Sequence, residues 1–172
     1  MFYYINNFFL FSISGFFFET ILFSILGMHN QSGFLHLFWT PFYGTGVLIT
    51  ILLSNFVKRK KISKHLQVLI LIIALFLVLS ILELIGGLLL EGLFGYSLWS
   101  YKGIPLHIGK YISVPTSFGW VCFSFLYLLF IKKYTDKLVN KIPKFVSISL
   151  LIIFIADNIV TILQTLKFRG FI

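Results

Sequence analysis

Acidic residues are the scarcest chemical group in this sequence: Asp and Glu together number five, against 14 Lys and Arg in 172 residues. Charged residues of both signs make up 11% of the chain, whereas a soluble domain is usually about one quarter charged. This shortage excludes an ordinary soluble domain. It also makes the position of each acid informative, because four of the five lie within apolar runs: Glu19, Glu83, Glu91 and Asp157.

Cysteine is almost absent. The single Cys122 excludes an intrachain disulfide and any cysteine-based metal cluster. The sequence has no Walker motif, and "GTG" at 44–46 lacks the Lys-Ser/Thr pair that completes a phosphate-binding loop. No Ser-His-Asp order and no HExxH motif is present. We therefore expect no cofactor and no bound metal, and an enzyme only of an unfamiliar intramembrane type.

Apolar residues, in contrast, are abundant. They make up 59% of the chain, and the mean hydropathy is +1.00. Apolar runs of about 18 residues or more, enough to cross a bilayer, recur along the sequence. We predict an all-α, polytopic protein of the cell membrane that forms one domain over 1–172, without an internal repeat. The five expected spans are about 5–27, 38–57, 67–93, 114–131 and 145–166.

Basic residues predict the orientation of these spans. The stretches 58–66 and 132–144 hold five Lys or Arg each, and the stretches on the opposite side hold four in total. Cytoplasmic loops carry such an excess. The N-terminus is then inside and the C-terminus outside, with 28–37 and 94–113 facing out. The net charge of +9 follows from this topology, so nucleic acid is not an expected partner.

The acids inside the spans are candidate functional residues, because an ionised carboxylate is costly in a bilayer. Such a group is expected to face the interior of a helix bundle, pair with a partner, or stay protonated. Glu19 and Glu83 are the leading candidates. Glu91 lies nearer the outer boundary, and Asp157 has a polar neighbour in Asn158, so both carry less weight.

Few partners are available to these carboxylates. On a helix, Glu83 and Glu91 differ by about 80° and are separated by ~12 Å, with Gly86 and Gly87 between them. The two glycines allow either close packing or a local break in the helix. We expect His36 and His107 to lie on the outer side, where they could pair with Glu19 or Glu91. Lys110 could fold back to the same place.

Two segments rich in glycine and aromatic residues, 30–46 and 94–120, complete the candidate site. The first is either an ordinary helix entry, with Pro41 in the first turn, or an unwound segment that lines a site. The second provides either interfacial aromatic anchors or a re-entrant segment that closes a cavity. The candidate binding residues here are Tyr43, Trp99, Tyr101, His107, Lys110 and Trp120, and the candidate structural residues are Gly33, Pro41, Gly44, Gly46, Gly86 and Gly87.

Four stretches carry a family resemblance: "GFFFETI" (15–21), "NQSGFLHLFWTPFYGTG" (30–46), "LELIGGLLLEGLFGYSLWSY" (82–101) and "IGKYISVPTSFGW" (108–120). In this order they resemble the CmpB-like family of small bacterial membrane proteins, the ABC-transporter type IV permeases. The resemblance covers about residues 10–130. Three charged positions of the family pattern differ, because its two arginines are Ser32 and Lys110 here and its aspartate is Ser100.

The resemblance and the acids together predict a permease or a substrate-binding membrane subunit. Glu19 and Glu83 would line an intramembrane cavity, and Glu91 would lie nearer its outer mouth. The expected partners are membrane lipids, further copies of the chain, and a separate membrane or ATPase subunit that would provide ATP coupling. One alternative is an accessory protein or enzyme that acts on a lipid or its headgroup at the outer leaflet. Another is a subunit that stabilises a partner complex.

Overall fold

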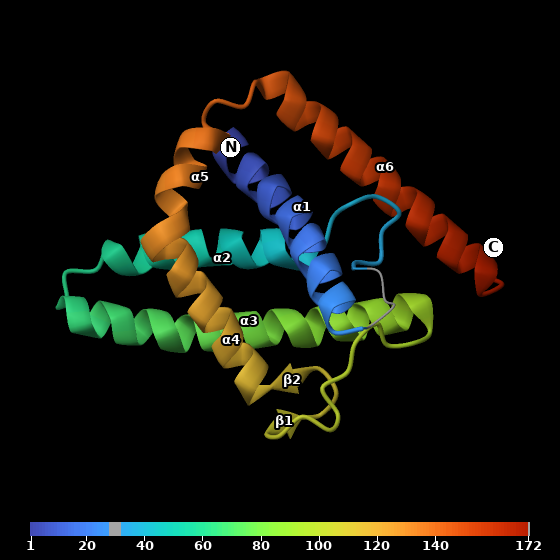
Figure 1. Ribbon diagram of the computed structural model, residues 1–172, viewed down its shortest axis with the longest axis horizontal. Coiled ribbons are helices and arrows are strands. Elements are labelled where there is room, and N and C mark those ends of the chain that lie inside the picture. The colour runs from blue at the N-terminus through green and yellow to red at the C-terminus, as the bar shows by residue number, and fades with distance from the viewer. Residues whose placement is uncertain (28–31, 172) are drawn as a thin grey trace. The chain divides into compact units, whose positions relative to one another are not determined.

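The computed structural model describes residues 1–27 and 32–171, in which the regular structure is helical apart from one short hairpin (Figure 1). This confirms the predicted all-α class. The predicted segments 28–37 and 30–46 fall in part on residues 28–31, which lie outside the described residues. The elements in chain order are α1 (Phe2–Ile25), α2 (Pro41–Lys58), α3 (Lys64–Phe94), β1 (His107–Ile108), β2 (Ile112–Ser113), α4 (Val114–Leu126), the π-helix η1 (Tyr127–Ile131), α5 (Lys132–Val139) and α6 (Lys144–Phe168).

Four helices of the described chain are long and apolar enough to cross a membrane. They match the first, third, fourth and fifth predicted spans, and large apolar side chains are exposed on all of them, as a lipid-facing surface requires. Helix α2 coincides with the predicted second span but is not among the four, so the count of five stays a prediction. The four are Phe2–Ile25, Lys64–Phe94, Val114–Val139 and Lys144–Phe168.

Local sequence explains where these helices begin and end. The hydroxyl of Ser63 accepts the Leu66 N–H and caps the start of α3, and Gly95 ends the helix with a left-handed φ of 81°. Pro41 is the first residue of α2, a position where its missing N–H costs nothing. The ordinary helix entry is therefore confirmed for 41–46.

The predicted loop 132–144 is wrong in its extent. The chain stays helical from α4 through η1 and α5 to Val139, and the connection to α6 is only 140–143. Lys132 and Asp136 form an ion pair one turn apart (2.5 Å), which favours the helix. Val139 is buried, and its carbonyl accepts the Asn6 amide (2.9 Å). The loop was predicted from its basic residues alone, whereas the residues up to Val139 are helical and make this tertiary contact.

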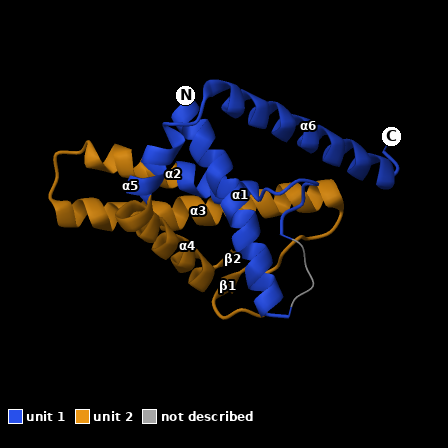
Figure 2. Ribbon diagram, turned by 45° about the horizontal axis from the view of Figure 1, so that its top comes forward, with its two compact units in different colours: residues 1–48, 132–172 blue, residues 49–131 orange. Residues whose placement is uncertain are grey.

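The chain divides into two compact units, coloured separately in Figure 2. The second unit, 49–131, is built on α3 and α4. Three leucines of α3 pack against Val121 of α4: Leu71, Leu75 and Leu79. Small polar residues let the helices approach and hydrogen-bond, as between Ser80 and Ser117 (2.6 Å).

The first unit consists of 1–48 and 132–172, and in it α1 packs against α5 and α6. The buried Asn6 accepts the hydroxyl proton of Ser147 at the start of α6 (2.6 Å). Further along, the rings of Phe9, Trp39 and Phe154 meet at centroid distances of 5.6–5.8 Å. These contacts link α1, α6 and the segment before α2.

Candidate functional site

Glu83 is the most deeply enclosed carboxylate of the second unit, with 5% of its surface exposed. Its Oε1 accepts two hydrogen bonds, from the Tyr101 hydroxyl (2.5 Å) and from Nε1 of Trp120 (2.9 Å). Its Oε2 is equally buried and has no hydrogen-bond partner among the described residues. The three predicted residues Glu83, Tyr101 and Trp120 therefore form one site.

The segment 95–113 reaches Glu83 by folding back along α3. Glu83 lies about three turns, or ~16 Å, before the helix ends at Phe94. The backbone of the segment satisfies itself: Tyr101 N–H donates to the Lys110 carbonyl (2.8 Å), and β1 pairs antiparallel with β2. A re-entrant segment requires backbone partners of this kind, and this interpretation of the segment stays a prediction.

Gly87 allows the fold-back to be close. Helix α3 continues unbroken through Gly86 and Gly87, so the predicted local break is absent, and close packing is seen at Gly87. A Cβ on Gly87 would collide with the ring of Tyr111, which is itself 2% exposed. The ring of Trp99 packs edge-on against Tyr111, with centroids 5.5 Å apart.

Glu91 lies two turns above Glu83 and is bound by the same segment. It forms an ion pair with Lys110 and accepts the Tyr111 hydroxyl at 2.7 Å. The hydrogen bond to Glu91 raises the pKa of the Lys110 ammonium, and burial raises the pKa of Tyr111. The predicted fold-back of Lys110 is confirmed. The alternative partner His107 is wrong, because its ring bonds the Ile104 carbonyl (3.0 Å).

In the first unit, Glu19 of α1 accepts the hydroxyl proton of Ser32 (2.5 Å), and Ser32 also bonds the Thr40 hydroxyl (2.8 Å). The segment 32–40 folds back along α1, as its counterpart does along α3. The Thr40 N–H reaches the carbonyl of Ser12 (2.9 Å), ~20 Å before α1 ends.

Glycines again allow close approach in this unit. A Cβ on Gly15 would collide with the ring of Tyr43, and one on Gly44 with Ser12. Gly33 has a left-handed φ of 77°, and a Cβ there would lie 2.9 Å from the Trp39 carbonyl. With Gly87 of the second unit, three of the predicted structural glycines have a packing or backbone role in the structure: Gly33, Gly44 and Gly87.

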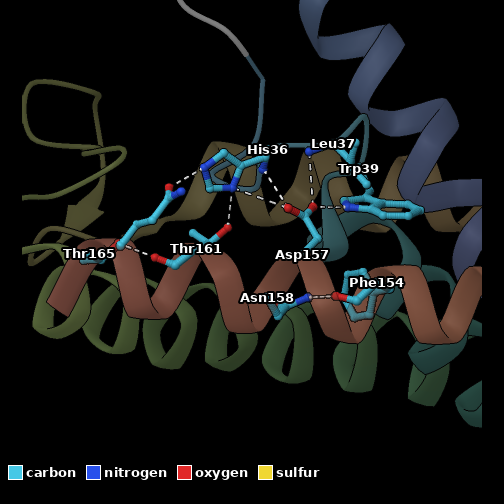
Figure 3. Close-up of polar contacts among 9 residues, drawn as sticks. His36, Leu37, Trp39, Phe154, Asp157, Asn158, Thr161 and Thr165 are labelled. Carbon is cyan, nitrogen blue, oxygen red and sulfur yellow. Dashed lines mark hydrogen bonds and ion pairs between the residues drawn. The ribbon is translucent and has the colours of Figure 1, made fainter. Parts of the chain in front are cut away.

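Asp157 of α6, which the sequence analysis gave less weight than Glu19 and Glu83, is a third carboxylate with several partners (Figure 3). It is 6% exposed and accepts the Trp39 indole N–H (2.7 Å). It also accepts the backbone N–H groups of His36 (3.2 Å) and Leu37 (3.1 Å). Asn158, its polar neighbour in the sequence, donates to the Phe154 carbonyl of its own helix.

The sequence analysis expected that His36 could pair with Glu19 or Glu91. It instead completes the cluster around Asp157. Its Nδ1 lies 3.4 Å from Asp157 and 2.8 Å from the Thr161 hydroxyl, and its Nε2 lies 2.7 Å from Gln164 (Figure 3). The sequence feature that points to Asp157 is the same one that points to the glutamates: an acidic residue within an apolar run. The proximity of 36–39 to α6 is a tertiary fact that no local pattern contains.

The carboxylates thus fall into two sets, one in each unit. In both, a Trp indole donates to a buried acid, and a non-helical segment supplies the remaining donors. Nowhere in the described parts of the chain do three or more His, Cys, Asp or Glu side chains gather as metal ligands.

Comparison with known proteins agrees with this architecture. The model of one protein family, described as Putative ABC-transporter type IV, matches residues 6–163. No curated protein and no solved structure matches the chain. The match spans both units and every carboxylate described above, and the chain therefore belongs to this family of ABC-transporter-related membrane proteins.

Proposed function

We propose that the chain is the substrate-binding membrane subunit, or permease, of a transporter, and that Glu83 binds the substrate. The observation that carries this proposal is the second oxygen of Glu83. A carboxylate can accept about four hydrogen bonds, and a buried acceptor left without a partner costs about 1–3 kcal/mol. Because Oε1 is held by Tyr101 and Trp120, Oε2 is oriented and has no donor among the described residues, so a donor or cation brought by a ligand would satisfy it.

The surroundings of Glu83 support a binding role rather than a packing role. A buried acid that served packing alone would be expected to have both oxygens satisfied, as Asp157 has. Segments that interrupt the helical pattern beside a buried charge recur at transporter substrate sites. Energy from ATP would come from a separate subunit, and the small size of the chain favours assembly with further subunits in the cell membrane.

The first test replaces Glu83 by glutamine, which keeps the size and removes the charge. A small molecule retained by the purified wild-type protein, detected by mass spectrometry, is expected to be lost from Glu83→Gln. Ser80→Ala is the matched control, because Ser80 lies one turn away on α3 and contacts Ser117, not Glu83. Equal retention by Glu83→Gln and the wild type would contradict the role of this carboxylate.

The proposed topology has five spans, with α2 as the fifth and the N-terminus inside. The first unit supports it, because Asn6 near the N-terminus bonds Val139 and Ser147 beside the basic segment 132–144. Segment 36–39 lies against the C-terminal half of α6, at Asp157, ~15 Å along the helix from Ser147. A common cytoplasmic location of the N-terminus and 132–144 is then expected.

Cysteine labelling tests this topology. In a Cys122→Ser background, Lys61→Cys and Lys141→Cys should react with a membrane-impermeant maleimide only after the cells are opened. Ile104→Cys should react in intact cells. Labelling of Lys61→Cys from outside would show that α2 does not span.

A second candidate, binding of a lipid or its headgroup, is favoured by one feature of the hairpin. Leu106 and Ile108 expose 70% and 62% of their surface, next to Lys102 and Lys110. Apolar residues flanked by lysines suit the depth of the headgroups. A phospholipid as the species retained in the mass spectrometry experiment would favour this candidate.

A further inference from the structure

Glu19 and Glu91 occupy equivalent positions in two versions of one arrangement. Each is the last residue of a Gly-x-x-x-Glu stretch on a spanning helix, "GFFFE" at 15–19 and "GLLLE" at 87–91. In each, a tyrosine ring from the segment that follows packs on the glycine: Tyr43 on Gly15, and Tyr111 on Gly87. The group that binds the glutamate also comes from the chain that follows the helix: Ser32 in the segment before α2, and Lys110 beside Tyr111.

The two sites differ in the charge of that group. Glu91 binds the ammonium of Lys110 as well as a phenol. Glu19 is bound by a hydroxyl, that of Ser32, whose other hydrogen-bond partner among the described residues is the neutral Thr40. No ion pair joins Glu19 to a basic residue in the part of the chain that the structure describes. Glu19 is half-buried, so an incoming group can reach it.

An aromatic side chain lies on the same side of α1 as Glu19, and further rings pack against it. Phe16 lies one turn earlier on α1, and Phe38 packs against both Phe16 and Phe17, with centroids 5.5 and 6.2 Å away. Phe17 and Phe38 remain 50% and 60% exposed. Aromatic faces next to a carboxylate form an environment that attracts organic cations.

We propose that Glu19 and Ser32 bind the ammonium group of a primary amine, in the position that the Lys110 ammonium takes at Glu91. The amine is either a soluble molecule or the headgroup of an aminophospholipid. The inference adds a second binding site to the proposed function. It rests on that function only in identifying the amine as a transported or sensed ligand.

The test measures binding in phosphatidylglycerol nanodiscs, which contain no ammonium lipid. Ethanolamine is titrated at constant ionic strength against sodium chloride, and the thermal unfolding midpoint is followed. A second arm compares discs with and without phosphatidylethanolamine, which separates the soluble from the lipid source. The wild type should show a saturable increase in one of the two arms.

Three variants make the result specific. Glu19→Gln should weaken amine binding about tenfold or more, because a charge-assisted hydrogen bond is lost. Ser32→Lys should unfold at a higher temperature without amine and lose the response, since it carries its own ammonium. Thr20→Ala is the control, because Thr20 bonds only the Phe16 carbonyl of its own helix, and should respond as the wild type does.

Several outcomes would overturn the assignment: no response of the wild type in either arm, a sodium response of equal size, or an unchanged response in Ser32→Lys. The amine titration and the mass spectrometry of Glu83→Gln are separate measurements, so failure of the amine response leaves the test of Glu83 intact. Loss of the response in Glu83→Gln but not in Glu19→Gln would move the amine to the other unit and also refute the proposal.

Discussion

Replacing Asp157 by alanine is expected to release the segment 36–39 and to lower the free energy of unfolding by about 3–5 kcal/mol. Three donors would lose their acceptor: the part-buried backbone N–H groups of His36 and Leu37 and the buried indole N–H of Trp39. Hydrogen bonds to a charged group are worth about 1.5–3 kcal/mol each, and they are not additive. Stability can be measured by denaturant unfolding in detergent, and release of the segment by hydrogen–deuterium exchange of 32–40.

The neighbouring residue provides the control for this prediction. Asn158→Ala removes a polar side chain from the same helix, but that side chain bonds only the Phe154 carbonyl one turn away. Its effect on unfolding should stay below about 1 kcal/mol. Asp157→Asn should lie between the two, because the amide keeps one acceptor oxygen. A loss as large in Asn158→Ala as in Asp157→Ala would mean that Asp157 does not anchor the segment.

Replacing Gly87 by valine is expected to detach the segment 95–113 from α3. A Cβ at this position meets the ring of Tyr111, and the ring is held on its other side by Trp99. Forcing extra atoms into such a contact costs about 1–3 kcal/mol. Movement of Tyr111 also removes its hydrogen bond to Glu91. The expected readouts are a lower unfolding midpoint and faster hydrogen–deuterium exchange over 99–113.

Gly92→Val is the matched control on the same helix. No atom comes within 4 Å of a Cβ built on Gly92, so this substitution has space. Its exchange over 99–113 should equal that of the wild type. If Gly87→Val and Gly92→Val behave alike, helix propensity rather than the contact with Tyr111 would explain the effect.

The candidate site could be predicted in part because polar groups in a bilayer are costly. That cost singled out Glu83, and it directed attention to Tyr101, Trp120 and Lys110 in the segment that follows. Asp157 received less weight because Asn158 adjoins it in the sequence, but the Asn158 amide donates to a carbonyl of its own helix rather than to Asp157. Adjacency in sequence places two side chains about 100° apart on a helix, so neighbours seldom pair.

The sequence by itself determined the helical class, the membrane setting and the family. These follow from apolar run length, from the distribution of charge and from ordered motifs, all of which are local along the chain. Only the tertiary structure decided which acid meets which donor: Lys110 at Glu91, Tyr101 at Glu83 and Trp39 at Asp157. The physical reason is that these contacts depend on two non-helical segments, 32–40 and 95–113, which fold back along α1 and α3. Glycines on these two helices have no side chain and leave room for a tyrosine ring.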